Sequence, residues 1–224
     1  MAASVGATFE EIQLACTTTP GPQFAFEGSF GLALLSRFPL LDSDILVLDS
    51  TLNRRAVIYA RVQAEQVEAH VFCTHLTAIL DDIPYPGTGS WEAEQRAQIE
   101  ALLAFIDDKT TDEDRVVLLG DLNTGPGFGD IAPAEEANYN LLLTRFRNPY
   151  IEELESPLCT FCAANPLVPD DADSVIIDHV LVRNLDSDET AARILTQEVQ
   201  VDVDGTPTTV ALSDHYGVRV ALIE

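Results

Sequence analysis

Residues 115–123, RVVLLGDLN, decide the fold, because an apolar strand ends there in a glycine, an acid and an amide. The apolar residues do not alternate with polar ones, so this strand is expected to be central in a sheet and covered on both faces. An extended backbone would place Asp121 and Asn123 on one side, since side chains two residues apart share a face. A carboxylate and an amide side by side suit holding a water and a phosphoryl oxygen together. An Asx-turn that caps the strand is an equally good interpretation of the pair.

A second apolar strand, residues 175–182 with the sequence VIIDHVLV, carries an acid in its middle. It too is expected to be central in the sheet and covered. Burying the Asp178 carboxylate costs on the order of several kcal/mol unless it is paired. The sequence therefore predicts a partner for Asp178, such as a histidine.

The rest of the chain holds short apolar runs separated by turn residues, and two helical patterns. Apolar residues at helical spacing predict a helix over 91–108, with Ser90 as its N-cap, and a shorter helix over 135–145. Asp204 and Gly205 predict a hairpin turn rather than a calcium loop. Many strands with few helices predict packed sheets with helices outside, in an α+β or layered α/β sandwich. The remaining expected strands are 31–36, 44–49, 55–63, 67–74, 194–201, 208–212 and 216–223.

Length and charge limit the possible functions. The 224 residues are 46% hydrophobic, enough for a single domain over 1–224, and no apolar run approaches the roughly 18 residues of a membrane span. The formal net charge is −25, and Lys109 is the only lysine. Such a surface excludes a broad electrostatic grip on nucleic acid or anionic lipid, which needs many basic side chains. A phosphate group must be held locally, and the candidates are Arg54, Arg55 and Arg96.

The four cysteines are too few for a disulfide scaffold and lack the ligand pattern of a structural zinc site. Cys73 lies in an apolar strand pattern and is expected to be buried. Cys159 and Cys162 are close enough along the chain to form a local disulfide. The first twenty residues hold neither a basic residue nor the apolar run of a secretory signal. Compartment and oligomeric state stay open.

Two histidines stand at the ends of strand-like segments. His75 lies in the stretch CTHL (73–76), at the end of an expected strand. A lone histidine at a strand end is more often structural than catalytic. His215 follows Ser213 and Asp214 at the turn before the last expected strand. There the adjacent acid and histidine could serve a metal and a substrate respectively, but each motif alone is a weak signal.

Five motifs follow one another in the chain: SRFP (36–39), THL (74–76), GDLN (120–123), IDHVLV (177–182) and SDH (213–215). Together they resemble the endonuclease/exonuclease/phosphatase superfamily, which includes pancreatic-type deoxyribonucleases, apurinic endonucleases, inositol polyphosphate phosphatases and neutral sphingomyelinases. The resemblance runs from Gly31 to the C-terminus. It implies an α/β (α+β) fold, a four-layered sandwich of two packed mixed, largely antiparallel sheets flanked by helices. It also implies divalent-metal-dependent hydrolysis of phosphoesters by water.

Carried over residue by residue, the resemblance assigns roles. His215 would be the general base or would polarise the attacking water, with Asp178 fixing its tautomer. Asp214 would ligate Mg²⁺, with Mn²⁺ or Ca²⁺ as alternatives.

The other motif residues would act on the phosphoryl group. Asp121 and Asn123 would orient the water and the phosphoryl group or hold a second metal. His75 would donate a hydrogen bond to an oxygen that gains charge in the transition state.

The family's asparagine on its first strand and its metal-binding glutamate on the second have no counterpart in this sequence. Before Gly31 the only acids are Glu10, Glu11 and Glu27, and residues 9–16 look like a helix that follows the missing pair. We expect an N-terminally truncated domain rather than loss of the first metal ligand. Secretion would be compatible with a missing N-terminus.

The resemblance is strongest to sphingomyelinase-like members, on modest signals. These are the Arg96-Ala97-Gln98 helix motif after THL, and Cys159-Thr160 followed by Asn165-Pro166. The loop between His75 and the helix that holds Arg96 carries Tyr85 and Trp91. It could face a lipid or an aryl leaving group, or it could cover the core.

The expected substrate is therefore a phospholipid or small organic phosphodiester. A nuclease of the same fold, acting on DNA or RNA, is one alternative. A degenerate binding protein, allowed by the missing glutamate, is another. Retention of the whole set of site residues favours an enzyme.

Overall fold

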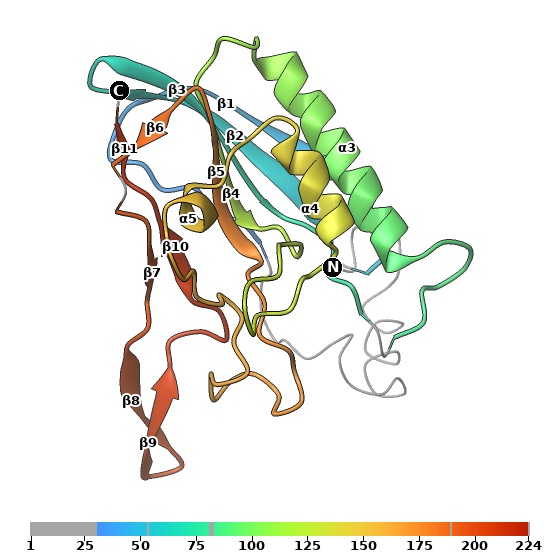
Figure 1. The fold of residues 1–224 in the computed structure, drawn as a ribbon, viewed down its shortest axis with the longest axis vertical. Coiled ribbons are helices and arrows are strands. Elements are labelled where there is room, and N and C mark those ends of the chain that lie inside the picture. The colour runs from blue at the N-terminus through green and yellow to red at the C-terminus, as the bar shows by residue number, and fades with distance from the viewer. Residues whose placement is uncertain (1–30, 53, 81–82, 189, 224) are drawn as a thin grey trace.

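The computed structural model describes residues 31–52, 54–80, 83–188 and 190–223, and its centre is a five-stranded sheet (Figure 1). The strand order is β1-β2-β3-β4-β5, and only the β3–β4 pair is parallel. The expected mixed, largely antiparallel sheet in an α+β fold is confirmed. The strands are β1 (Leu40–Leu48), β2 (Arg55–Ala64), β3 (Val67–His75), β4 (Val116–Asp121) and β5 (Asp178–Arg183).

Two helices, α3 (Trp91–Lys109) and α4 (Glu136–Leu143), cover one face of this sheet (Figure 1). Because β3 and β4 are parallel, their connection must cross the sheet, and α3 supplies that crossover. The side chain of Ser90 accepts a hydrogen bond from the amide of Ala93, so the predicted N-cap is confirmed. The core between helices and sheet includes Phe72, Leu102 and Leu118, which are fully buried.

The opposite face of the sheet is covered by short elements, with Val117 and Val182 buried beneath them. β4 is therefore covered on both faces, as predicted, whereas Arg115 before it is exposed. These elements form two-stranded sheets, β10-β7 and β11-β6, together with the short helix α5. Their bounds are α5 (Pro149–Glu152), β6 (Asp186–Ser187), β7 (Ala192–Ile194), β10 (Gly217–Arg219) and β11 (Leu222–Ile223).

A hairpin of β8 (Glu198–Val203) and β9 (Thr206–Ala211) projects from the body of the molecule (Figure 1). Asp204 and Gly205 form its turn, with φ of 52° and 82°. Positive φ at both central residues gives a turn whose twist matches the paired strands. The predicted hairpin turn is confirmed.

The strand expected at 31–36 is wrong. These residues form no strand, and the side chain of Leu35 is 93% exposed. A strand needs a hydrogen-bonded neighbour, and this segment pairs with none of the described residues. The first strand begins instead at Leu40, earlier than the expected 44, because pairing with β2 extends to that residue.

Two of the expected C-terminal strands are divided in the structure. The strand expected at 194–201 is broken at Leu195, whose φ of 59° is incompatible with extended backbone. The strand expected at 216–223 is divided into β10 and β11, which pair with different partners.

The strand expected at 175–182 begins only at Asp178, because Val175 makes an isolated bridge to Phe161. Asp178 therefore lies at the start of a strand and not in its middle. β5 is also the last strand of the five-stranded sheet, not a central one. Its burial comes from α5 and β10, which contact it.

Cys73 is buried and free, and Cys159 and Cys162 form a disulfide, so both expectations for the cysteines are confirmed. Among the described residues, no helix is long and apolar enough to cross a membrane. The helix expected at 9–16 and the acids Glu10, Glu11 and Glu27 lie outside the described residues.

Candidate active site

Three strand ends align at one edge of the main sheet. His75, the last residue of β3, is the register partner of Asp121, the last residue of β4. Asp121 is in turn the partner of Asp178, the first residue of β5. Strand pairing alone thus brings one imidazole and two carboxylates into one row.

His215 joins this row from the turn before β10. Its Nδ1 lies 2.8 Å from Oδ2 of Asp178. The ring of Phe161 lies beside the imidazole, with ring centroids 5.1 Å apart. The partner that the sequence predicts for the Asp178 carboxylate is therefore a histidine, and it comes from a residue 37 positions away.

The charge environment favours the imidazolium form of His215. Burial opposes that form, but the hydrogen bond to Asp178 and the charges of Asp178, Asp121 and Asp214 outweigh it and raise the pKa of His215 to about 9. A group held between carboxylates in this way keeps its proton at neutral pH while no other cation is bound.

The environment of Asp121 favours the neutral form of this side chain. Burial and the neighbouring charge of Asp178 raise the pKa of Asp121 to about 7. Its Oδ2 lies 3.2 Å from Nε2 of His75, and its Oδ1 accepts the amide hydrogen of Asn123. Ionising Asp121 at this position therefore costs free energy unless an additional positive charge lies nearby.

His75 is neutral at physiological pH. Burial and then the positive charges of Arg55 and His215 lower the pKa of His75 to about 3. Arg55 is itself buried, and its Nη1 donates to the carbonyl of His75 at 3.5 Å. A neutral imidazole can donate a hydrogen bond from one nitrogen without adding charge to the site.

Asn123 does not share a face with Asp121 in the way that an extended backbone would give. It follows the end of β4 in a left-handed conformation, with φ of 49°. Its amide N–H bonds Oδ1 of Asp121 at 2.9 Å, so the Asx-turn interpretation holds. Its Nδ2 donates to the carbonyl of Leu76 at 2.9 Å and thereby ties the loops after β3 and β4 together.

Other predicted residues lie outside this row. Asp214 is exposed, with Oδ1 accepting from Ser213 Oγ at 3.2 Å, and it does not join the group of possible metal ligands found among the described residues. Arg54 is exposed, and Arg96 pairs with Glu100 on the outer face of α3. Of the three arginines proposed for phosphate, only Arg55 approaches the row.

The two aromatic residues expected in the loop before α3 differ in burial, because Trp91 is buried and Tyr85 is half-buried and lines a cavity. Trp91 is buried, and its indole N–H donates to the carbonyl of Ile83 at 2.7 Å. Tyr85 packs edge-on against the Trp91 ring, with centroids 4.8 Å apart.

Sequence reasoning missed a buried polar contact that positions the loops of the site. Gln95 on α3 is fully buried, and its Nε2 donates to the carbonyls of Thr77 at 2.9 Å and Asn123 at 2.8 Å. Its Oε1 accepts from Asn138 on α4. The available signal was a pair of glutamines, Gln95 and Gln98, on the apolar face of the helix.

The site could hold a divalent cation. One ligand atom from each of Asp121, Asp178 and His215 lies within 4.8 Å of the others. Carboxylate oxygens are the ligands that Mg²⁺ prefers, with water completing its octahedron. The raised pKa of Asp121 agrees with this, because a buried carboxylate pair is relieved by a cation. The donor set therefore fits Mg²⁺.

A sequence profile described as "Endonuclease/Exonuclease/phosphatase family" matches residues 4–215. No curated protein sequence matches the chain.

Several solved structures share the fold. SmcL is similar with a TM-score of 0.63 and 18% identity, over 82% of this chain and 65% of that one. Sphingomyelinase C from Streptomyces griseocarneus gives a TM-score of 0.57 and 20% identity, over 83% and 66% of the two chains. Beta toxin from Staphylococcus aureus, a mutant with bound magnesium ions, gives 0.61 and 15%, over 83% and 66%. This chain thus spans 65–66% of the length of these three proteins.

Proposed function

This chain belongs to the endonuclease/exonuclease/phosphatase family, and from that premise we propose that it is a divalent-metal-dependent phosphodiesterase. The observation that carries the proposal is the row of His75, Asp121 and Asp178 at adjacent strand ends, with His215 bonded to Asp178. A binding protein has no need of a histidine held by a carboxylate beside a second carboxylate.

His215 handles the proton of the attacking water. Asp178 occupies Nδ1, so it fixes the tautomer and leaves Nε2 to accept that proton. At a pKa of about 9 the imidazole is protonated at neutral pH in the metal-free chain, and a cation held by the carboxylates would lower this pKa and so favour the basic form. Neutral His75 donates to a phosphoryl oxygen as negative charge grows there.

Asp121 and Asp178 would hold the metal ion. Two further oxygen donors are close in sequence to the site: Asn123 follows β4, and Asp214 precedes His215. The cation would stabilise negative charge on the phosphoryl oxygens. Arg55, buried behind His75, adds a fixed positive charge close to Asp121. Water is the nucleophile, and an alcohol leaves from phosphorus.

The proposed substrate is a phospholipid or a small organic phosphodiester. Sphingomyelinase C is among the proteins that share the fold, which supports this class. The net charge of −25 and the outward placement of Arg54 and Arg96 disfavour a grip on a DNA or RNA backbone. A nuclease is therefore the weaker candidate.

The chain is expected to hydrolyse bis(p-nitrophenyl) phosphate with Mg²⁺ and to lose this activity in EDTA. Because the metal competes with the proton of Asp121, whose pKa is about 7, and disfavours that of His215, whose pKa is about 9, the apparent Mg²⁺ affinity should rise with pH up to about 9 and then level off. Calorimetric titrations in buffers of different ionisation enthalpy measure the released proton.

Choline phospholipid vesicles and single-stranded DNA, used as parallel substrates, separate the two enzyme classes. Turnover of DNA alone would favour the nuclease. Absence of turnover on every substrate, with Mg²⁺ binding intact, would contradict the enzyme proposal and favour a binding protein.

Asp178→Asn is expected to lower turnover and to shift the pH–rate profile, because an amide can hold the wrong tautomer of His215 and does not stabilise its cation. In a double-mutant cycle with a second change at His215, the two effects should be far from additive, since they remove one shared contact. The measurement is kcat across pH for the single and double variants. Additive losses would contradict a functional pairing.

A further inference from the structure

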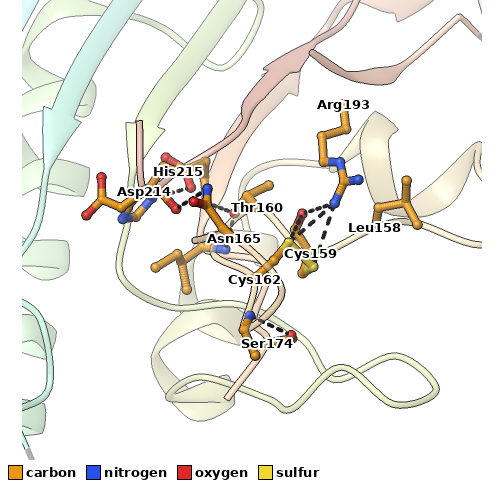
Figure 2. Close-up of a disulfide and its surroundings, with 12 residues drawn as sticks. Leu158, Cys159, Thr160, Cys162, Asn165, Ser174, Arg193, Asp214 and His215 are labelled. Atoms are coloured by element: carbon orange, nitrogen blue, oxygen red, sulfur yellow. Dashed lines mark hydrogen bonds and ion pairs between the residues drawn. A yellow bond between two sulfur atoms is a disulfide. The ribbon is translucent and has the colours of Figure 1, made fainter. Parts of the chain in front are cut away.

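The segment between the disulfide cysteines lies near His215 (Figure 2), and it also contacts Asp178 through a hydrogen bond of Thr160. Asp178 begins a strand of the main sheet, whereas His215 belongs to a turn before a short strand in another sheet. Nothing in the main sheet's hydrogen bonding fixes His215. Some other element must therefore hold the turn at a constant distance from β5.

Thr160 contacts the Asp178 side of the pair. Its side chain is fully buried, and Oγ1 accepts hydrogen bonds from the amides of Ile177 at 3.0 Å and Asp178 at 3.1 Å. Its own amide donates to the carbonyl of Val175 at 2.9 Å. One hydroxyl group thus adds two hydrogen bonds to the strand pairing that holds the start of β5.

The same residue contacts the His215 side. The carbonyl of Thr160 accepts the amide hydrogen of Tyr216 at 2.8 Å. The next residue, Phe161, forms a bridge to His215, and its ring lies beside the imidazole at an angle of 54°. Asn165, also buried, donates from Nδ2 to the carbonyls of Ser213 and Asp214 at 2.9 and 3.2 Å.

The disulfide and Arg193 hold this segment in place. Cys159 and Cys162 flank Thr160 and Phe161, so the crosslink closes the backbone around both contacts. Arg193 on β7 donates from Nη1 to the carbonyl of Cys159 at 3.0 Å, and its guanidinium lies 4.5 Å from the ring centroid of Tyr216 (Figure 2). The segment is thereby anchored to the strand that pairs with β10.

We propose that Thr160 is a positioning residue, and that the disulfide loop 159–162 sets the geometry of the Asp178–His215 pair. The inference rests on the proposed function, because it assigns the loop a role in that reaction. The loop contributes no residue to the cluster of possible metal ligands among the described residues, and it acts through the backbone of Asp178 and the turn that carries His215. A displacement of about 1 Å in a catalytic group can cost about 100-fold in rate, so such a device matters.

The test uses two replacements that separate the effect of the hydroxyl group from that of the methyl group. Thr160→Val removes the hydroxyl and keeps the branched shape, whereas Thr160→Ser keeps the hydroxyl. We expect kcat for the chromogenic phosphodiester with saturating Mg²⁺ to fall about 10-fold or more in Thr160→Val, with KM within about twofold, and to be largely retained in Thr160→Ser. Thr208→Val on the exposed β8–β9 hairpin is the matched control.

The disulfide is tested in the same assay with Cys159→Ser/Cys162→Ser. An excess of a dithiol gives the same break in the wild type, since it transfers two electrons and two protons to the two sulfurs and is itself oxidised to a cyclic disulfide. Both treatments should lower kcat, as Thr160→Val does. The dithiol should leave the kcat of the double serine variant unchanged.

Amide hydrogen exchange gives a readout that does not depend on activity. In Thr160→Val the amides of Ile177 and Asp178 should lose protection, while that of Tyr216, which bonds a backbone carbonyl, should change less. If these shifts occur in a chain that hydrolyses no phosphodiester, the proposed function fails and the loop's structural contact stands. An active chain in which Thr160→Val matches Thr160→Ser in kcat would overturn the positioning role.

Discussion

Replacing His215 by alanine is expected to lower phosphodiester turnover by about 100-fold or more at every pH where the wild type is active. In the proposed reaction this side chain supplies the nitrogen that accepts the proton of water, and its Nδ1 is bonded to Asp178. Initial rates with saturating Mg²⁺ across pH measure this effect. Retained turnover would contradict the assignment of His215 as the base.

The stability of the same variant separates a catalytic role from a structural one. The pKa of His215 is raised to about 9 in the folded chain, from an ordinary value of 6.5. Its contribution to the stability of the metal-free protein is therefore fully present below about pH 6.5 and lost as pH rises through about 9. His215→Ala should have a lower Tm than the wild type at pH 6 and nearly the same Tm at pH 9.5, whereas turnover is lost at both.

A second histidine on the same sheet provides the control. His70 lies nearer the other end of β3, is buried, and has Nδ1 3.0 Å from the hydroxyl of Tyr59. His70→Gln should reduce Tm through the lost contact and leave kcat within about twofold, because a buried hydrogen bond contributes about 1 kcal/mol to folding and nothing here links it to the reaction. Equal losses of kcat in both variants would indicate a general effect of folding.

The sequence predicted the structure correctly where a residue type can be buried in only one way. A carboxylate such as Asp178 among apolar residues requires a partner, and the structure places a histidine nitrogen 2.8 Å from it. The central position of β4 followed from its unbroken apolar run. Both inferences rest on burial, but burial does not fix the position in the sheet, because the equally apolar β5 is the last strand.

Sequence reasoning failed where long-range contacts choose among local conformations. Leu195 adopts positive φ and ends β7 although its neighbours favour a strand, and 31–36 has strand-like residues without a described partner. The left-handed Asn123 depends on contacts from Leu76 and Gln95, which lie on other segments. The loop that holds His215 was likewise invisible, because its contacts link residues about 55 positions apart.

Asp121→Asn is expected to abolish turnover and, in EDTA at pH 8, to raise the Tm of the chain. The raised pKa of Asp121, about 7 against 3.8, means that the folded state holds this proton more tightly than the unfolded state. The stabilisation that the proton provides is lost as pH rises from about 4 to about 7, and at pH 8 the wild type bears the full cost of the buried charge. Asparagine keeps an oxygen for the amide of Asn123 and removes that cost.

The chain's charge of −25 requires a matched control for this result, since removing any acid reduces self-repulsion. Asp130→Asn removes one exposed charge far along the loop from the row, and it should change Tm far less. At pH 4 the advantage of Asp121→Asn should disappear, because Asp121 is then protonated in the wild type. Added Mg²⁺ should raise the Tm of the wild type more than that of the variant, since the variant lacks one of the two carboxylates proposed to bind the ion. A variant that is less stable than the wild type at pH 8 without metal would mean that Asp121 is a structural residue, and the cluster would then lose its strongest argument for holding a cation.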